Sequence, residues 1–220
     1  MNIVKENLAG IQEEIAPYTP NIIAVTKYFD ESKIIEAYEA GLRDFGESRI
    51  PEAIDKIQRL PKEVRQNSRF HLIGHLQTNK VRKVIGVFEY IHSVDSLKLA
   101  QVISQEALEQ NIIQKVLLQV NNANEVQKFG FSKEELLKNF EQIKTLKGIN
   151  IIGLMNMAPL GLEERDLRKL FLDVVEIRDE LEKKFGCKLK EISMGMSGDY
   201  KEAVVAGATM IRLGRKLFSQ

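Results

Sequence analysis

The chain has 220 residues, of which 44% are hydrophobic, and this length suits one large domain or two small ones. Lysine and arginine total 32 and aspartate and glutamate total 31, so the formal net charge is +1. This balance gives no basic excess of the kind that marks a nucleic-acid-binding protein, and the only cysteine, Cys187, excludes an intrachain disulfide.

The first sixteen residues, MNIVKENLAGIQEEIA, predict an amphipathic helix with acidic side chains. They lack the long apolar core of a signal peptide. No later apolar run approaches the ~20 residues that span a bilayer. We therefore expect a cytoplasmic protein that binds neither a membrane nor a nucleic acid.

Short β-branched runs then alternate with helical patterns along the first half of the chain. Pro51 lies near the first turn of one predicted helix, where its missing N–H costs nothing, and Asp95 is a candidate cap of another. The predicted strands are 21–27, 42–47, 69–74 and 87–94, and the predicted helices are 31–41, 50–60, 76–85 and 95–110.

The second half repeats the same alternation. A Ser-x-x-Glu capping box, Ser132 to Glu135, opens one of its helices. The predicted strands are 112–121, 149–156, 189–195 and 209–214, the predicted helices are 132–146, 162–186 and 199–207, and a short remnant of a last helix follows residue 214.

About eight strands, each followed by a helix, imply parallel pairing. The predicted fold is therefore α/β: a single-domain TIM (β/α)8 barrel over residues 1–220, with an extra N-terminal helix. An open doubly wound sheet is the alternative. The first strand-to-helix turn, TKYFDES, lacks the Gly-x-Gly-x-x-Gly of dinucleotide-binding folds, so that version of the open sheet is disfavoured.

In such a barrel the functional site lies at the carboxyl ends of the strands, and phosphate commonly binds between the last two strand-to-helix turns. Here those turns are GMSGD and GRK. Glycines let the backbone approach a phosphate, the helix starting at Asp199 offers free N–H groups, and the Ser197 hydroxyl can donate another bond. Glycines that only permit tight turns are the alternative. Asp199 also replaces the last glycine of a Gly-x-Ser-x-Gly elbow, which disfavours serine-hydrolase chemistry.

Two cations at strand ends are candidates for chemistry. Lys27 ends the first strand, and a desolvated lysine near Arg212 and Arg215 keeps more of its amine uncharged for attack on a carbonyl. A lysine that extends along the barrel rim is an equal alternative. Arg212, if it points inward, is a natural ligand for an anion or a ring nitrogen, whereas its alternative partner is a rim carboxylate.

The histidines favour a structural role over a metal site. His71 and His75 share one face of a predicted strand, but no third ligand occurs at a convincing spacing. His92 is a single histidine in another strand and has the same interpretation. We therefore expect no bound metal.

Seven segments, in chain order, resemble the pyridoxal 5′-phosphate homeostasis proteins, a family with the fold of the N-terminal barrel domain of alanine racemase. The resemblance implies pyridoxal 5′-phosphate as the cofactor. The segments are AVTK (24–27), DFGESR (44–49), HLIGHLQTNK (71–80), QKFG (127–130), GLMNMAPL (153–160), SMGMSGD (193–199) and GATMIRLG (207–214).

The resemblance also implies roles for individual residues. Lys27 would form the Schiff base with the cofactor aldehyde, and Arg212 would face the pyridine nitrogen. Ser197 would bind the phosphate together with the backbone N–H groups of Gly214 and Arg215. Many members have Ser or Thr where this chain has Arg215, whose guanidinium would add a charge-assisted contact. The implied neighbours of the ring are Ser48, His71 and Met196.

A permanent cation beside the pyridine nitrogen disfavours its protonation, and an unprotonated ring is a poor electron sink. Alanine racemases take a second acid/base, a tyrosine, from a further domain, and we expect that domain to be missing here. The resemblance thus implies a monomeric binding protein of vitamin B6 and amino- and keto-acid homeostasis, without strong catalysis, that serves pyridoxal phosphate-dependent apo-enzymes. The alternatives are a racemase, a Schiff-base barrel enzyme acting on a phosphosugar, and an interaction protein for which the cofactor is a signal.

Overall fold

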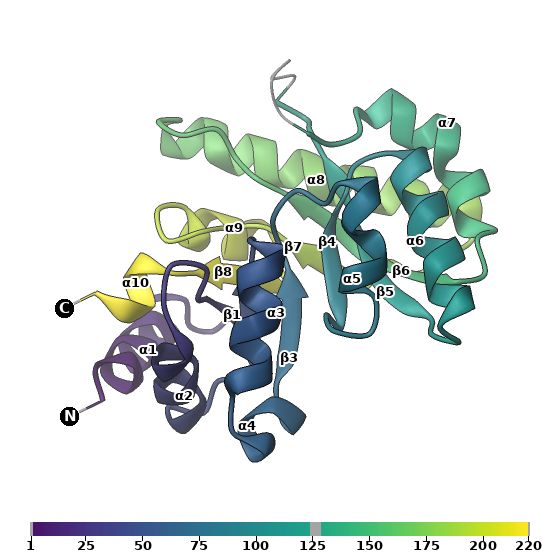
Figure 1. Cartoon of the computed structure of the whole chain (residues 1–220). Helices are drawn as coiled ribbons and strands as arrows, with labels where there is room; N and C mark the ends of the chain where they lie inside the picture. Colours follow the sequence, from purple (N-terminus) through teal and green to yellow (C-terminus); the bar gives the residue numbers. More distant parts are fainter. Residues whose placement is uncertain (1, 124–128, 220) are drawn as a thin grey trace.

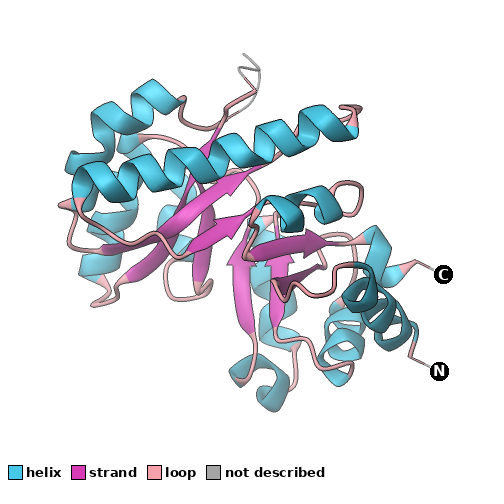
Figure 2. Ribbon diagram, turned by 180° about the vertical axis from the view of Figure 1, so that it is seen from behind, coloured by secondary structure: helices cyan, strands magenta, loops and turns pink. Residues whose placement is uncertain are grey.

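A computed structural model of the chain describes residues 2–123 and 129–219, so Gln127 and Lys128 of the QKFG segment lie outside the described residues. Eight parallel strands close into one barrel in chain order, and helices surround it (Figures 1 and 2). The predicted TIM barrel is thus confirmed. In the part of the chain that the structure describes, no helix is both long and apolar enough to cross a membrane.

Each strand is followed by helical structure before the next strand begins, and one helix precedes the barrel. The strands are β1 (Asn21–Val25), β2 (Asp44–Glu47), β3 (Arg69–Leu72), β4 (Tyr90–Val94), β5 (Gln114–Val120), β6 (Ile149–Asn156), β7 (Glu191–Ser193) and β8 (Met210–Leu213). The helices are α1 (Ile3–Glu14), α2 (Glu31–Glu39), α3 (Ile50–Arg59), α4 (Lys62–Gln66), the 3-10 helix η1 (Thr78–Lys80), α5 (Val81–Val84), α6 (Leu97–Glu109), α7 (Lys133–Lys144), α8 (Glu164–Phe185), α9 (Tyr200–Ala206) and α10 (Arg215–Phe218).

Local signals explain several helix starts. The predicted capping box at Ser132 and Glu135 is present at α7. The predicted cap of α6 is wrong: the helix starts two residues later than expected, so the Ser96 hydroxyl accepts from the Leu99 N–H at 3.3 Å. Asp95 instead lies 3.3 Å from His75 at the rim of the barrel. The single helix expected over 76–85 is divided into η1 and α5, and α4 was not predicted.

Hydrogen bonds and ion pairs connect the N-terminal helix α1 to the last two strand-to-helix units. The Glu14 carboxylate accepts from the Tyr200 hydroxyl and lies 3.0 Å from both Lys201 and Lys216. These hydrogen bonds hold the pKa of Glu14 down to about 2, against a small opposing effect of burial. One carboxylate therefore joins α1 to α9 and α10, the two helices that follow β7 and β8.

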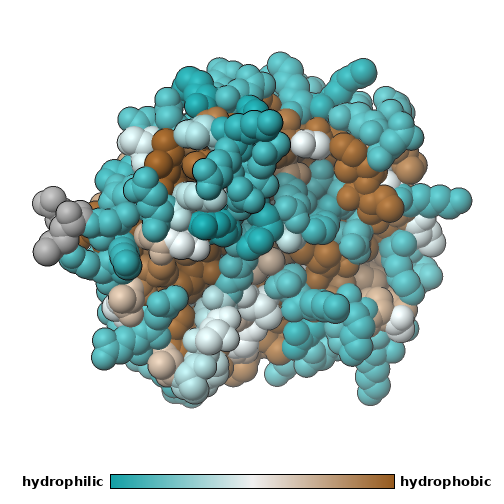
Figure 3. All heavy atoms as spheres, turned by 90° about the horizontal axis from the view of Figure 1, so that it is seen from below, coloured by the Kyte–Doolittle hydropathy of each residue, from teal (hydrophilic) through white to brown (hydrophobic). Residues whose placement is uncertain are grey.

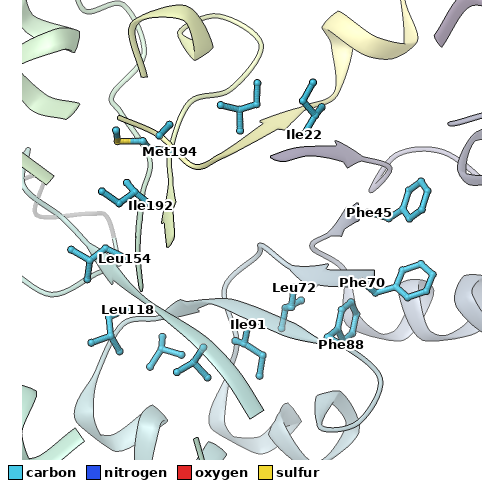
Figure 4. Packing of buried hydrophobic residues seen from close by; sticks show 14 of the residues in the cluster. Ile22, Phe45, Phe70, Leu72, Phe88, Ile91, Leu118, Leu154, Ile192 and Met194 are labelled. Atoms are coloured by element: carbon cyan, nitrogen blue, oxygen red, sulfur yellow. The ribbon is translucent and has the colours of Figure 1, made fainter. Parts of the chain in front are cut away.

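Alternate residues of each strand face two different environments. Outward side chains pack against the helices in one apolar layer, as Figure 4 shows for residues of successive strands such as Phe45, Phe70 and Leu154. The face seen in Figure 3 is covered mostly by hydrophilic side chains with smaller hydrophobic areas between them.

Several inward positions of the barrel are polar and buried, whereas branched apolar side chains usually fill a barrel of this type. These residues are Asp44, His71, His92, Ser193 and Arg212.

Gly153 marks an irregularity of β6 next to β7. The pairing register with β5 shifts by one residue between Val116 and Leu117, so β6 contains an extra residue. At Gly153 a Cβ would lie 1.7 Å from the carbonyl oxygen of Glu191 in β7. Only glycine lets these two strands approach so closely.

We predict that Gly153→Ala lowers the free energy of unfolding by about 3 kcal/mol, because the β6–β7 pair must separate to admit the methyl group. Urea unfolding measures this change. Gly10→Ala is the matched control, since a Cβ at Gly10 in α1 meets nothing within 4 Å and alanine favours a helix by about 0.5–1 kcal/mol. Equal stability of the two variants would contradict the prediction.

Candidate functional site

The turns after β7 and β8 meet at one hydroxyl group. Ser197, in the turn after β7, accepts hydrogen bonds from the N–H groups of Gly214 and Lys216, both at 3.3 Å, in the turn after β8. The expected donors were the N–H groups of Gly214 and Arg215. In the structure, Lys216 takes the place of Arg215 as the second donor to Ser197, and the Arg215 side chain is exposed. The serine hydroxyl thus lies where N–H groups of the second turn converge, which is an arrangement suited to an anion.

A glycine sets the conformation of the first of these turns. Gly195 has φ +90°, and a Cβ there would lie 2.6 Å from Ala203 Cβ in α9. The half-buried Met196 follows, and its N–H donates to Asp199 Oδ1 at 2.5 Å. Burial raises the pKa of Asp199. The turn is therefore held closely against the start of α9.

Arg212 lies inside the barrel, 3% exposed. Its Nη1 donates to Ser193 Oγ at 2.6 Å, and its Nη2 donates to the carbonyl oxygen of Asn156 at 2.8 Å. Burial lowers the pKa of the guanidinium to about 10, so it remains charged at neutral pH. These two bonds leave other guanidinium N–H groups for a ligand.

Lys27 follows the carboxyl end of β1, the strand that pairs with β8. Thr26 extends the ladder through a 3.0 Å bond from its N–H to the Gly46 carbonyl, and Lys27 begins the turn that follows. The lysine is half-buried, with Nζ 5.0 Å from the centre of the Tyr28 ring. A Cβ at Gly214 would lie 3.6 Å from Val25, so the end of β1 packs against the turn after β8.

The predicted ring neighbours lie at different depths. Ser48 is half-buried just beyond β2, where its backbone lies against Gly74. His71 is fully buried, and protein partners occupy both ring nitrogens, Asp44 Oδ1 at 2.8 Å and His92 Nε2 at 2.9 Å. His75, expected at the core or rim, stacks on Phe129 with 3.7 Å between ring centres.

Asp44 anchors His71 at the amino end of the barrel. Its carboxylate accepts from the His71 ring and from the guanidinium of Arg69. Burial alone would raise the pKa of Asp44, but these hydrogen bonds outweigh it and lower the pKa to about 2. The carboxylate is therefore charged throughout the neutral range.

Sequence reasoning missed a buried ion pair directly behind Lys27. Lys56, on α3, donates from Nζ to the Thr26 carbonyl at 2.8 Å and to Glu47 Oε1 at 2.6 Å. The Thr26 hydroxyl donates to the same carboxylate oxygen at 2.6 Å. These bonds fix the peptide unit that precedes Lys27. The sequence did indicate that Lys56 is buried, because it comes three residues after Ala53 on the apolar face of its helix.

Among residues 2–123 and 129–219, no group of three or more His, Cys, Asp or Glu side chains is arranged to hold a metal ion. The arrangement instead provides a converging pair of turns, a buried cation and an amine on three adjacent strands, β7, β8 and β1. A phosphate-binding site at the mouth, between the last two strand-to-helix turns, is common in barrels of this class.

Comparison with known proteins identifies the family. The family model described as "Alanine racemase, N-terminal domain" matches residues 1–219. A pyridoxal phosphate homeostasis protein of Synechocystis sp. is 44% identical over 208 residues, which cover 94% of each chain. The chain belongs to the family of pyridoxal phosphate homeostasis proteins.

Solved structures agree with this assignment. PipY of Synechococcus elongatus PCC7942, solved without PLP, matches with a TM-score of 0.90 and 39% identity over 98% of this chain and 100% of that chain. The same protein with PLP bound matches with a TM-score of 0.88 and 38% identity, over the same shares of the two chains.

We predict that Lys56→Met lowers the free energy of unfolding by about 3–5 kcal/mol, because Glu47 would remain buried without its counter-charge. Adding Glu47→Gln should recover part of the loss, as a double-mutant cycle in urea would show. Lys133→Met is the control, since its pair with Glu180 is solvent-exposed and should contribute less than about 1 kcal/mol. A similar loss in both single variants would refute the buried pair's role.

We also predict an acid dependence of stability from Asp44. Its folded-state pKa of about 2 is below the ordinary value of 3.8, so its stabilisation is present above pH 3.8 and is lost as pH falls towards 2. The shift corresponds to about 2 kcal/mol. Chemical denaturation at several pH values should therefore give Asp44→Asn a flatter acid profile than the wild type. The exposed Asp55→Asn should follow the wild-type profile.

Proposed function

We propose that this chain binds pyridoxal 5′-phosphate at the carboxyl ends of its strands and holds it reversibly, without strong catalysis of its own. One observation carries the proposal: the Ser197 turn, the buried Arg212 and the end of β1 that bears Lys27 lie on three adjacent strands. The PLP-bound structure of PipY supports the identity of the ligand.

The residues fit the chemical groups of this cofactor. Convergent backbone N–H groups suit a phosphate, and a buried guanidinium donor suits the lone pair of a pyridine nitrogen. Asn156, beside Arg212, has a buried Oδ1 that lacks a hydrogen-bond partner in the described part of the chain. An orphaned buried acceptor is expected where a ligand supplies the donor.

Pyridoxal phosphate supplies an aldehyde that condenses reversibly with a lysine amine to give a Schiff base. Lys27 provides that amine, and Ser197 with the N–H groups of Gly214 and Arg215 holds the phosphate. Arg212 donates to the ring nitrogen and, as a cation, keeps a proton off that atom. Arg212 thereby favours holding the cofactor over stabilising a substrate carbanion.

The same proposal includes the neighbours of the cofactor ring and the biological role of the protein. Ser48 and Met196 flank the ring from the ends of β2 and β7, and His71 acts on the ring from behind, through the barrel interior. We propose a cytoplasmic monomer that supplies pyridoxal phosphate-dependent apo-enzymes and so affects vitamin B6 and amino- and keto-acid balance. Relatives named pyridoxal phosphate homeostasis proteins support the homeostatic role.

We predict that borohydride treatment of the protein with pyridoxal phosphate attaches a pyridoxyl group to Lys27. Peptide mass mapping should find this adduct in the wild type and lose it in Lys27→Ala. Lys190→Ala is the control, because this exposed lysine precedes β7 at the opposite end of the barrel.

An adduct that persists in Lys27→Ala, or is absent from the wild type, would overturn the proposal. Catalysis is tested separately by amino-acid α-proton exchange in deuterated water. Exchange at roughly 1 s⁻¹ or faster would make the protein a pyridoxal phosphate-dependent enzyme such as a racemase.

A further inference from the structure

Five buried side chains form a continuous hydrogen-bonded chain through the barrel interior, here called the interior chain. Asp44 Oδ1 lies 2.8 Å from His71 Nε2, and His71 Nδ1 lies 2.9 Å from His92 Nε2. His92 Nδ1 lies 3.0 Å from Ser193 Oγ, which accepts from Arg212 Nη1 at 2.6 Å. All five residues are at most 3% exposed. The chain joins a carboxylate at the amino ends of the strands to the cation at the candidate cofactor site.

The two ends of the interior chain, together with neutral histidines, set the direction of every hydrogen bond. A guanidinium only donates, so Ser193 Oγ accepts from Arg212, and its O–H is free to donate to His92 Nδ1. An ionised carboxylate only accepts, so His71 Nε2 must carry a hydrogen and donate to Asp44. With both histidines neutral, His71 Nδ1 accepts from the Nε2–H of His92, and His92 Nδ1 accepts from the Ser193 hydroxyl, so both rings carry their hydrogen on Nε2.

Burial supports this assignment. It lowers the pKa of His71 and holds that of His92 well below its usual value, so neither ring takes up a second hydrogen near neutral pH. The other charged groups near the chain do not break it. Arg69 donates to Asp44 from the amino end, Tyr90 stacks on His71 with 4.4 Å between ring centres, and Asp199 attracts Arg212 from the mouth.

We propose that His71, His92 and Ser193 are positioning residues that hold Arg212 in one orientation and link its charge to Asp44. Aligned hydrogen bonds polarise one another, so each neutral link presents its negative end towards Arg212. With Nη1 held by Ser193 and Nη2 by the Asn156 carbonyl, the guanidinium plane is defined. The free N–H groups then face the ligand without further ordering. The identity of that ligand rests on the proposed function.

The first test needs no cofactor. The chain has three histidines, so side-chain nitrogen NMR of 15N-histidine-labelled protein should show three rings, and His75→Asn assigns the one outside the interior chain. We expect His71 and His92 to be neutral with hydrogen on Nε2 between about pH 7 and about pH 9. A hydrogen on Nδ1 of either ring, or an imidazolium in this range, would overturn the interior chain.

The second test compares two buried serines, Ser193 on β7 and Ser93 on β4. Ser193→Ala removes a link, whereas Ser93→Ala removes a 1% exposed hydroxyl that has no hydrogen-bond partner among the described residues. We expect Ser193→Ala to shift the His92 Nδ1 resonance and to weaken pyridoxal phosphate binding about tenfold, the effect of one lost bond to a charged group. Ser93→Ala should leave the histidine spectrum unchanged and affinity within about twofold of wild type.

The outcomes separate the two proposals. Failure of the wild type to bind pyridoxal phosphate would contradict the proposed function. The histidine spectra would still decide whether the interior chain exists. If the wild type binds the cofactor and both serine variants bind it equally well, the positioning role of Ser193 is wrong. If Ser193→Ala does not fold, the affinity is measured on Ser193→Thr instead. This variant keeps the hydroxyl and must bind within about twofold of wild type for the positioning role to stand.

Discussion

The barrel is organised around the need to keep one guanidinium charged inside a protein. Arg212 is buried and its hydrogen-bond partners among the described residues are neutral, so its charge is balanced at a distance. Removing such a cation from water is costly unless every donor near it has a suitable acceptor. Inward positions of β2, β3, β4 and β7 meet this need with polar side chains instead of the usual branched apolar ones.

A second buried charge supports the mouth of the barrel from outside. Lys56 reaches from α3 to the Thr26 carbonyl and to Glu47, so the end of β1 is held by the helix layer while Arg212 is held from within. The end of β1 that precedes Lys27 and the Arg212 guanidinium are thus held by two independent networks. A binding site whose side chains are already ordered loses less entropy when the ligand arrives.

Under the proposed function, the same arrangement favours holding a cofactor over catalysis on it. Rigid placement of a lysine, an anion-binding turn and a permanent cation would suit reversible binding of a phosphate-bearing aldehyde. Strong catalysis on such a cofactor needs an electron-accepting ring and a second acid/base, and a permanent cation at the ring nitrogen would work against the first of these. Likeness to the alanine racemase fold does not by itself indicate racemase activity.

The sequence alone determined the alternation of strands and helices, the closed parallel barrel, the capping box at Ser132 and the two glycine turns, because these depend on local periodicity and backbone freedom. The short segments from Ala24 to Gly214 also identified the family. Only the tertiary structure decided the partners of His71 and the role of Lys56. Those bonds join residues that are 9 to 30 positions apart, and barrel closure with its strand register brings them together. No local pattern encodes that register, so buried polar partners on different strands become visible only once the strands are paired.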